Sequence, residues 1–154
     1  MGAYPQRGMA LLVSLVFLLL LTLIGVSSMQ NATLQEKMAG SVVMRNQSFQ
    51  AAEAALRVGE SAVQHDSYSL PECSGAIRCA PPAESSSVTT GGHNPVSGVT
   101  WYASGNGFYA VQNIGTSQTA VNVPINTLAT LYRITAVGLT GNSRSVVESI
   151  YAKY

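Results

Sequence analysis

Side chains that could carry out chemistry are few in this sequence and widely spaced. His65, Asp66 and His93 are the candidates for acid–base work, and the many serines are candidate nucleophiles. No P-loop, nucleophile elbow or His-Glu-x-x-His motif accompanies them, and Gly105-Asn106-Gly107 lacks the strand-turn-helix context of a dinucleotide site. The sequence therefore predicts no enzyme activity and no cofactor. We expect His65 at the C-terminal end of a helix, where its partial positive charge is favourable, and His93 in a loop.

The two cysteines, Cys73 and Cys79, stand close together among prolines. A chain exported behind an apolar N-terminus enters an oxidising compartment, where we expect them to form a disulfide. The alternative is two free thiols. No second Cys or His pair stands at ligand spacing, so no metal site is expected. A bridge across so short a loop would shape the loop more than it stabilises the fold.

Length and charge bound the remaining possibilities. The chain has 154 residues, of which 10% are charged, and its formal net charge is +1. That length suits one domain beside a long helix, and the low charge gives no field that would attract nucleic acid. Residues 85–132 contain no Asp, Glu, Lys or Arg. Such a neutral surface suits close contact with neighbouring subunits, but it also suits a weakly charged extracellular domain.

An uncharged apolar run from Met9 to Val26 dominates the N-terminus. As a helix its 18 residues rise about 27 Å, close to the thickness of a bilayer's hydrocarbon core. Arg7 is the only charge before it, which places the N-terminus on the cytoplasmic side. The Arg7-Gly8 junction lies at the start of the run, whereas an ordinary secretory signal is cut beyond its apolar region. A cut here would keep the apolar helix on the mature protein.

The helical pattern continues beyond the apolar run. No proline occurs from Ser27 to about His65, and apolar residues recur at spacings of three, four or seven, namely Leu34, Met38, Val42, Phe49, Ala52, Leu56 and Val63. A solvated face carries Glu36, Lys37, Arg45, Glu53, Arg57 and Glu60. The pattern predicts one helix from Met9 to about His65, about 86 Å long. Because one small domain cannot cover such a helix, its apolar half must contact lipid or other helices.

The rest of the chain predicts a loop followed by a sheet. Prolines, serines and glycines make residues 67–98 a connecting loop. Four strand-like runs follow, at Val99–Tyr102, Phe108–Gln112, Ala129–Val137 and Ser145–Ala152. The alternating set Tyr132, Ile134 and Ala136 is expected to pack on the helix. The predicted class is therefore α+β, a long helix across an antiparallel sheet of about four strands.

These features resemble a known family. The leader that ends in Gly8, the apolar helix that continues into an amphipathic one, and the small β-rich domain resemble a type IV pilin or a type II secretion pseudopilin. More narrowly, Gly8-Met-Ala-Leu-Leu-Val13, Gln35-Glu-Lys-Met-Ala-Gly40, Phe49-Gln-Ala-Ala-Glu-Ala-Ala-Leu56 and Tyr132-Arg-Ile-Thr135 resemble the PilX-type minor pilins. The resemblance covers the first 60 residues closely and the C-terminal hairpin loosely.

The resemblance implies a division of the chain and a processing site. The divisions are a prepilin leader 1–8, a transmembrane and assembly half-helix 9–26, an amphipathic half-helix 27–66, a loop 67–98 with the cysteine pair, and an antiparallel sheet 99–154. Prepilin peptidase would cut between Gly8 and Met9, and Met9 would be N-methylated. The helix would then join the central bundle of a filament, in a type IV pilin-like fold.

One position departs from the family's pattern. Most pilins have Glu at the fifth mature position, which here is Val13. In the family this carboxylate is thought to pair with the terminal ammonium of the subunit added before it, which offsets the cost of a charge in apolar surroundings. A subunit with Val13 fits the first position. The alternative is that Val13 only contacts lipid and that another contact positions the subunit.

The resemblance therefore implies a minor pilin that helps to initiate pilus assembly and lies at or near the tip, supporting twitching motility and adhesion. Expected partners are other minor pilins, the major pilin, prepilin peptidase and the inner-membrane assembly machinery. The expected location is the inner membrane, single-pass with a periplasmic C-terminus, and after assembly the pilus (fimbrium) on the cell surface. Alternatives are a secretion pseudopilin, a tip adhesin that binds through Trp101, Tyr102 and Tyr109, and a plain single-span membrane protein.

Overall fold

The computed structural model describes residues 7–154, with side chains from Met9 onward. Residues 1–6 of the predicted leader lie outside this range, and Arg7 and Gly8 begin the first helix. The chain divides into two compact units, of which the first ends at Ser41 and the second is Val42–Tyr154. Each unit is described by itself.

The first unit consists of helix from residue 7 to residue 41. It belongs to α1 (Arg7–Gln64), which has 58 residues and includes a stretch long and apolar enough to cross a membrane. The hydroxyls inside this stretch do not remain unpaired, because Ser14 Oγ donates to Leu11 O at 2.9 Å and Thr22 Oγ1 donates to Leu19 O at 2.8 Å. Such bonds to the preceding turn make serine and threonine tolerable in an apolar medium. The prediction of one helix across this region is confirmed.

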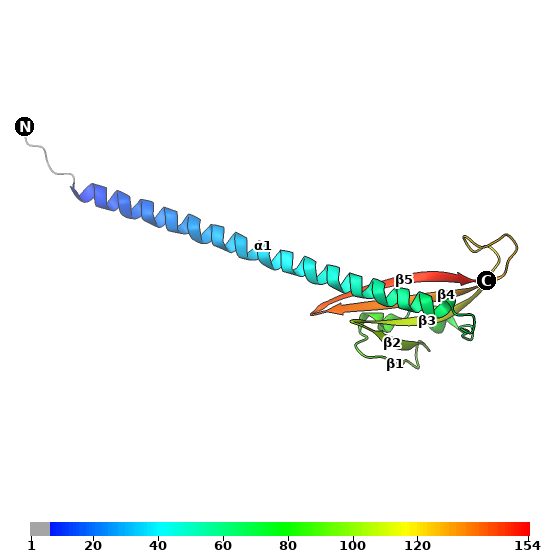
Figure 1. Ribbon diagram of the computed structural model, residues 1–154. Helices are drawn as coiled ribbons and strands as arrows, with labels where there is room; N and C mark the ends of the chain where they lie inside the picture. Colours follow the sequence, from blue (N-terminus) through cyan, green and yellow to red (C-terminus); the bar gives the residue numbers. More distant parts are fainter. Residues whose placement is uncertain (1–6) are drawn as a thin grey trace, which may run out of the picture. The chain divides into compact units, whose positions relative to one another are not determined.

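The second unit contains a five-stranded antiparallel sheet (Figure 1). Its order is β1 (Gly92–His93), β2 (Thr100–Ser104), β3 (Gly107–Ser117), β4 (Ala129–Thr140) and β5 (Ser143–Lys153). All four predicted strands are present, and the α+β class is confirmed. Three of them are longer than predicted, whereas β2 begins one residue later and ends two residues later than predicted. The fifth strand is the two-residue β1, which lies in the segment predicted to be loop.

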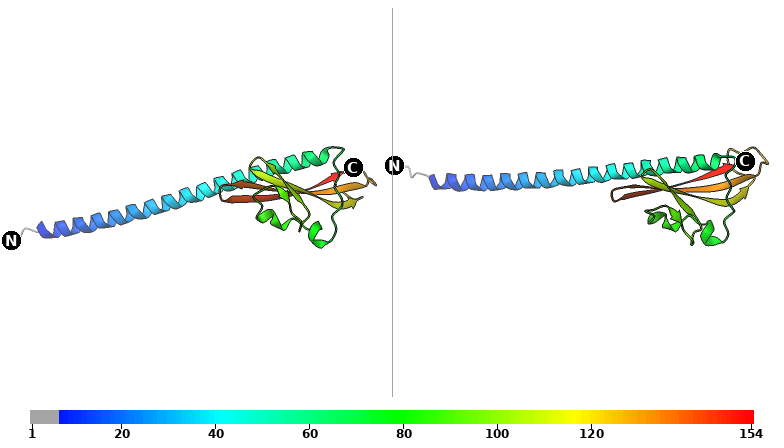
Figure 2. Two further views of the ribbon diagram at one scale, coloured as in Figure 1. Left: turned by 90° about the horizontal axis from the view of Figure 1, so that it is seen from below. Right: turned by 60° about the horizontal axis from the view of Figure 1, so that its bottom comes forward.

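The part of α1 that belongs to the second unit packs on one face of the sheet (Figure 2). Its buried residues are small or β-branched and recur at helical spacing: Ser48, Ala52, Ala55, Gly59 and Val63. Gly138 of β4 lies directly beneath this stripe, because a Cβ built on it would meet Ser48 O at 2.0 Å. The missing side chain therefore permits a close approach of helix and sheet.

The predicted helix stripe is correct only in part. Ala52 and Val63 are fully buried and Leu56 packs against the core, but Leu34, Met38, Val42 and Phe49 are exposed. Ser48 is the first buried residue of α1. Because Phe49 follows Ser48 by one residue, its side chain lies beside the face of small residues that contacts the sheet and not on it, and it is 47% exposed.

Each face of the sheet has its own core. On the helix side Val63 packs with Val111, Tyr132 and Ile134, which confirms the predicted inward face of β4. On the other side Trp101 packs with buried residues of the sheet and of the loop before it, which are Val99, Ala110 and Val137, with Val88, Phe108 and Leu139 partly buried.

The connecting segment 67–98 covers this second face. It contains the short helix α2 (Ala76–Cys79) and the 3-10 turn η1 (Ala83–Ser86), and both lie on the side of the sheet opposite α1 (Figure 2). The segment predicted to be a loop is thus a third layer of the domain. The layers of the second unit are therefore α1, the sheet and the connecting segment, with the sheet in the middle.

Candidate functional surfaces

The apolar part of α1 exposes large side chains within residues 9–26. Its large side chains are about half to two thirds exposed, among them Leu11 (70%), Phe17 (62%), Leu21 (67%) and Ile24 (67%). Exposed apolar area of this extent in water is strongly unfavourable. Lipid or other apolar helices would stabilise such a surface.

Val13 lies within this surface, one helical turn after Met9. It is 47% exposed, and the side chains around it on the helix are Met9, Phe17 and other uncharged residues. Residues 9–26 hold no carboxylate, so no acidic group of this stretch is available to an ammonium near Val13. Gly8 and Met9 lie in the first turns of α1. Cleavage between them and methylation of Met9 remain predictions.

The two cysteines lie at the start of the connecting segment. Cys73 and Cys79 form a disulfide, with a Cα–Cα distance of 5.3 Å. The bond closes a loop around α2, and the Cys73 N–H donates to Asn113 O of β3 at 2.9 Å. The disulfide loop is therefore fastened to the sheet as well as to itself.

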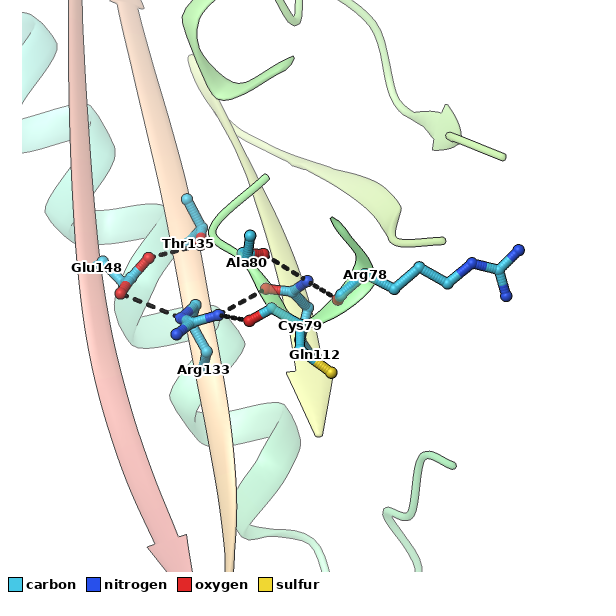
Figure 3. Close-up of polar contacts among 7 residues, drawn as sticks. All are labelled: Arg78, Cys79, Ala80, Gln112, Arg133, Thr135 and Glu148. Carbon is cyan, nitrogen blue, oxygen red and sulfur yellow. Dashed lines mark hydrogen bonds and ion pairs between the residues drawn. The ribbon is translucent and has the colours of Figure 1, made fainter. Parts of the chain in front are cut away.

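Two side chains of the sheet hold the disulfide loop by its carbonyl groups (Figure 3). Gln112 of β3 is 5% exposed, and its Nε2 donates to Arg78 O at 2.7 Å and to Ala80 O at 3.1 Å. Arg133 of β4 donates from Nη1 to Cys79 O at 2.7 Å. Three consecutive carbonyls of the loop thus accept from the sheet, which satisfies backbone groups that would otherwise be orphaned.

Arg133 also joins this loop to β5. Its Nε lies 3.2 Å from Glu148 Oε1, and Thr135 Oγ1 donates to Glu148 Oε2 at 3.4 Å. We call Gln112, Arg133, Thr135 and Glu148 the anchoring cluster. Its chemistry is structural, because among the described residues no buried side-chain nitrogen or oxygen lacks a hydrogen-bond partner.

The histidines and Asp66 do not form a site. His65 and Asp66 follow the end of α1 and are exposed, as the sequence predicts for His65, and the His65 carbonyl accepts from Lys153 Nζ. His93 was expected in a loop but lies in β1, where its Nδ1 is 3.3 Å from Thr100 Oγ1. Within residues 7–154 no group of three or more His, Cys, Asp or Glu side chains comes together as metal ligands.

The aromatic residues divide between the two faces of the sheet. Trp101 is 3% exposed and its indole N–H donates to Glu84 Oε1 at 3.3 Å, so the adhesin interpretation is wrong for this residue. Tyr102 is 51% exposed and stacks on Tyr109 with ring centroids 5.5 Å apart. Burial is the main cause that raises the pKa of Tyr68 to about 12, and it also raises the pKa of Tyr109. Tyr102 alone of the three proposed contact residues presents a largely exposed ring.

Comparison with known proteins gives one match. Residues 7–57, about a third of the chain, match the family described as PilX N-terminal. The match spans the apolar part of α1 and continues into the part that packs on the sheet, and it ends before the strands begin. Searches of curated proteins and of solved structures gave no match.

Proposed function

We propose, from the membership of residues 7–57 in the PilX N-terminal family, that this chain initiates assembly of a type IV pilus and ends at or near its tip. The match over residues 7–57 supports a PilX-type minor pilin, a structural subunit that associates with other pilus components. The long apolar helix and the α+β domain agree with a type IV pilin-like fold. Its position in the filament, and its support of twitching motility and adhesion, are the proposed part.

The proposed position of the subunit at the start of the filament rests on Val13. After cleavage at Gly8, Met9 would carry a free ammonium group inside an apolar bundle, where an unpaired charge costs several kcal/mol. A neighbouring subunit with a carboxylate at the Val13 position would offset this cost. This chain can present its own ammonium to such a neighbour, but it has no carboxylate for a subunit added earlier. A subunit of this kind fits the start of a filament.

The disulfide supports the proposed orientation. Cys73 and Cys79 are bonded, and disulfides persist in oxidising compartments such as the periplasm. Arg7 is the only charge before the apolar run, which favours a cytoplasmic N-terminus. We infer a single-pass protein of the inner membrane that prepilin peptidase processes, that the assembly machinery incorporates, and that other minor pilins and the major pilin contact in the filament.

The N-terminal mass of the chain from sheared surface filaments tests the processing. The expected mass begins at Met9 and carries one methyl group on its amine. A chain that retains Met1, or that is cut beyond Val26, would contradict processing as a pilin. Absence of the chain from filaments would contradict its role as a pilus subunit and leave a secretion pseudopilus as the alternative.

Immunogold labelling of an epitope-tagged chain tests the position. The wild-type protein is expected only at filament ends, whereas Val13→Glu is expected to appear along the shaft because it can accept an earlier subunit's ammonium. Val13→Leu is the matched control, since it changes the side chain without adding a carboxylate. Wild-type protein distributed evenly along the shaft would refute the argument from Val13.

A further inference from the structure

β5 forms a long, regular and open edge of the sheet. It pairs with β4 over all eleven of its residues without a shift in register, and among residues 7–154 no other strand pairs with it. The opposite edge strand, β1, has only two residues. Natural sheets commonly shorten, bulge or cover an edge, because its unpaired backbone groups can pair with another chain. None of these devices interrupts β5.

The hairpin turn determines which backbone groups of β5 are free. Gly141 and Asn142 form a two-residue turn between the paired residues Thr140 and Ser143. In such a hairpin the flanking pair is hydrogen-bonded, and bonded and non-bonded pairs then alternate along the ladder. The odd-numbered residues of β5 therefore bond to β4. The N–H and C=O groups of the even-numbered residues, from Arg144 to Ala152, point away from the sheet.

The charged side chains of β5 are all bonded within their own chain. Arg144 donates to a backbone carbonyl of η1 at 3.1 Å, and Glu148 pairs with Arg133 of β4 at 3.2 Å (Figure 3). Lys153 donates to the carbonyl of Tyr68 at 3.0 Å and to that of His65. Charges at an edge normally oppose the addition of a strand. Here each is directed at an internal partner.

The side chains that remain free beside the edge are apolar. Val146 is 45% exposed and Ile150 is 55% exposed, and both lie on the sheet face opposite α1. A strand added to β5 would place alternate side chains next to these two, where apolar and β-branched neighbours stabilise pairing. The free backbone groups of β5 thus require an extended polypeptide as the partner. The side chains of Val146 and Ile150 favour apolar residues on the face of that polypeptide that lies beside them.

We propose that β5 accepts a β-strand from a different protein chain, with apolar side chains beside Val146 and Ile150. A second copy of this chain is a less suitable occupant. Two β5 strands paired antiparallel along their full length would place Glu148 opposite Glu148, and Arg133 of each chain is already bonded to its own Glu148, so it is not free to offset the second carboxylate. The inference does not require a tip position or a pilus. If the chain is a pilus subunit, the strand belongs to another component of the filament.

The test compares two double variants of the full-length chain in the host's own membranes. Val146→Pro with Ile150→Pro removes two outward N–H donors and leaves the β4 ladder intact, since proline is tolerated on the free side of an edge strand. Val146→Thr with Ile150→Thr is the matched control, because it keeps both donors and β propensity. The readout is the mass of the complex extracted in mild detergent, together with hydrogen exchange of β5.

The wild-type chain and the double threonine variant are expected to form a complex with a second, different polypeptide. In this complex the even-numbered amides of β5 should exchange at least tenfold more slowly than in the separated chain. The proline chain is expected to lose at least nine tenths of that complex. A proline chain that keeps it, a complex of identical chains, or even-numbered amides that exchange equally fast in both states would overturn the proposal. The proposed function would fail in a different experiment, by absence of the chain from sheared filaments.

A second variant covers the case in which the proline chain does not fold. Val146→Lys with Ile150→Lys keeps every backbone donor and places charge at exposed positions, which the fold tolerates. The same loss of the complex is expected, because lysines at an edge oppose strand addition. Formation of the Cys73–Cys79 disulfide and the fluorescence of buried Trp101 verify that this variant is folded. A folded lysine variant that retains the complex would also overturn the proposal.

Discussion

Gly138→Ala tests the closest contact between helix and sheet in the second unit. A Cβ on Gly138 would lie 2.0 Å from Ser48 O and 2.3 Å from Ala52 N, and both are backbone atoms of α1. Backbone atoms of a helix cannot rotate aside as a side chain can. The helix would have to move away from β4 by about 1 Å or more before the methyl group makes an ordinary contact.

Such a movement has a large energetic cost. It would stretch the bonds from Ser48 Oγ to two serine hydroxyls of β5, which are now 3.1 and 2.8 Å long, and would open gaps beside the buried Ala52 and Ala55. Overpacking of a close contact typically costs 1–3 kcal/mol, and a clash with rigid backbone belongs at the upper end, so we expect a loss of about 3 kcal/mol. For a domain of this size that corresponds to a decrease in Tm of about 12 °C.

The assay is thermal unfolding of the full-length chain in detergent micelles, followed by the fluorescence of Trp101. Trp101 is the only tryptophan of the chain and is buried, so its emission reports unfolding of the sheet domain. Gly40→Ala is the matched control, because a Cβ there meets nothing within 4 Å and alanine favours helix. A Gly138→Ala chain that melts within about 2 °C of the wild type would refute the close packing of α1 on β4.

Two further substitutions test individual contacts. Ser48→Ala removes the hydroxyl shared with two serines of β5 and should lower the free energy of unfolding by about 1–2 kcal/mol in the same assay; an unchanged Tm would mean that these bonds contribute nothing. The raised pKa of Tyr68, about 12 when folded against about 10 when unfolded, leaves stability unchanged below pH 10 and lowers it from pH 10 to 12, because only the unfolded chain then loses the proton. Tyr68→Phe should flatten that decline, and equal slopes for the two chains would contradict the shift.

The sequence predicts the long helix and the strands because their signals are local. Three signals are visible without knowledge of distant contacts. They are the absence of charge in residues 9–26, the absence of proline from Met9 to Gln64, and the alternation at Tyr132, Ile134 and Ala136. Hydrophobic periodicity alone, however, selects the largest apolar residues of a helix face. Periodicity therefore favours Phe49 as the contact residue. In the structure the sheet contacts the helix at Ser48, because the helix backbone approaches Gly138 so closely that a larger side chain would not fit between them.

The connecting segment could not be predicted as a layer of the domain. Its prolines and serines are typical of a surface loop, and its order depends on side chains far away in the sequence, chiefly Gln112 and Arg133. The sequence does carry one signal, which is the polar residue in β3 and in β4 at positions that alternate with those facing α1, namely Gln112 and Arg133. A buried Gln or Arg in a strand must find a partner, and carbonyl groups of a covering loop are suitable acceptors.

Arg133 connects this covering loop with the open edge of β5, and that connection yields a last prediction. Its guanidinium bonds Cys79 O on one side and the Glu148 carboxylate on the other. In Arg133→Met, Glu148 loses its cation, and its carboxylate should turn towards water beside the free edge. A negative charge there should weaken the addition of a partner strand, so less of the complex should form through β5. The disulfide should also be reduced faster by dithiothreitol, because Cys79 O has lost its bond to Arg133.

The double variant Arg133→Met with Glu148→Gln also removes the negative charge. It should restore the complex, whereas the disulfide should still be reduced faster than in the wild type. If the single and double variants lose the complex equally, the charge of Glu148 does not control the edge.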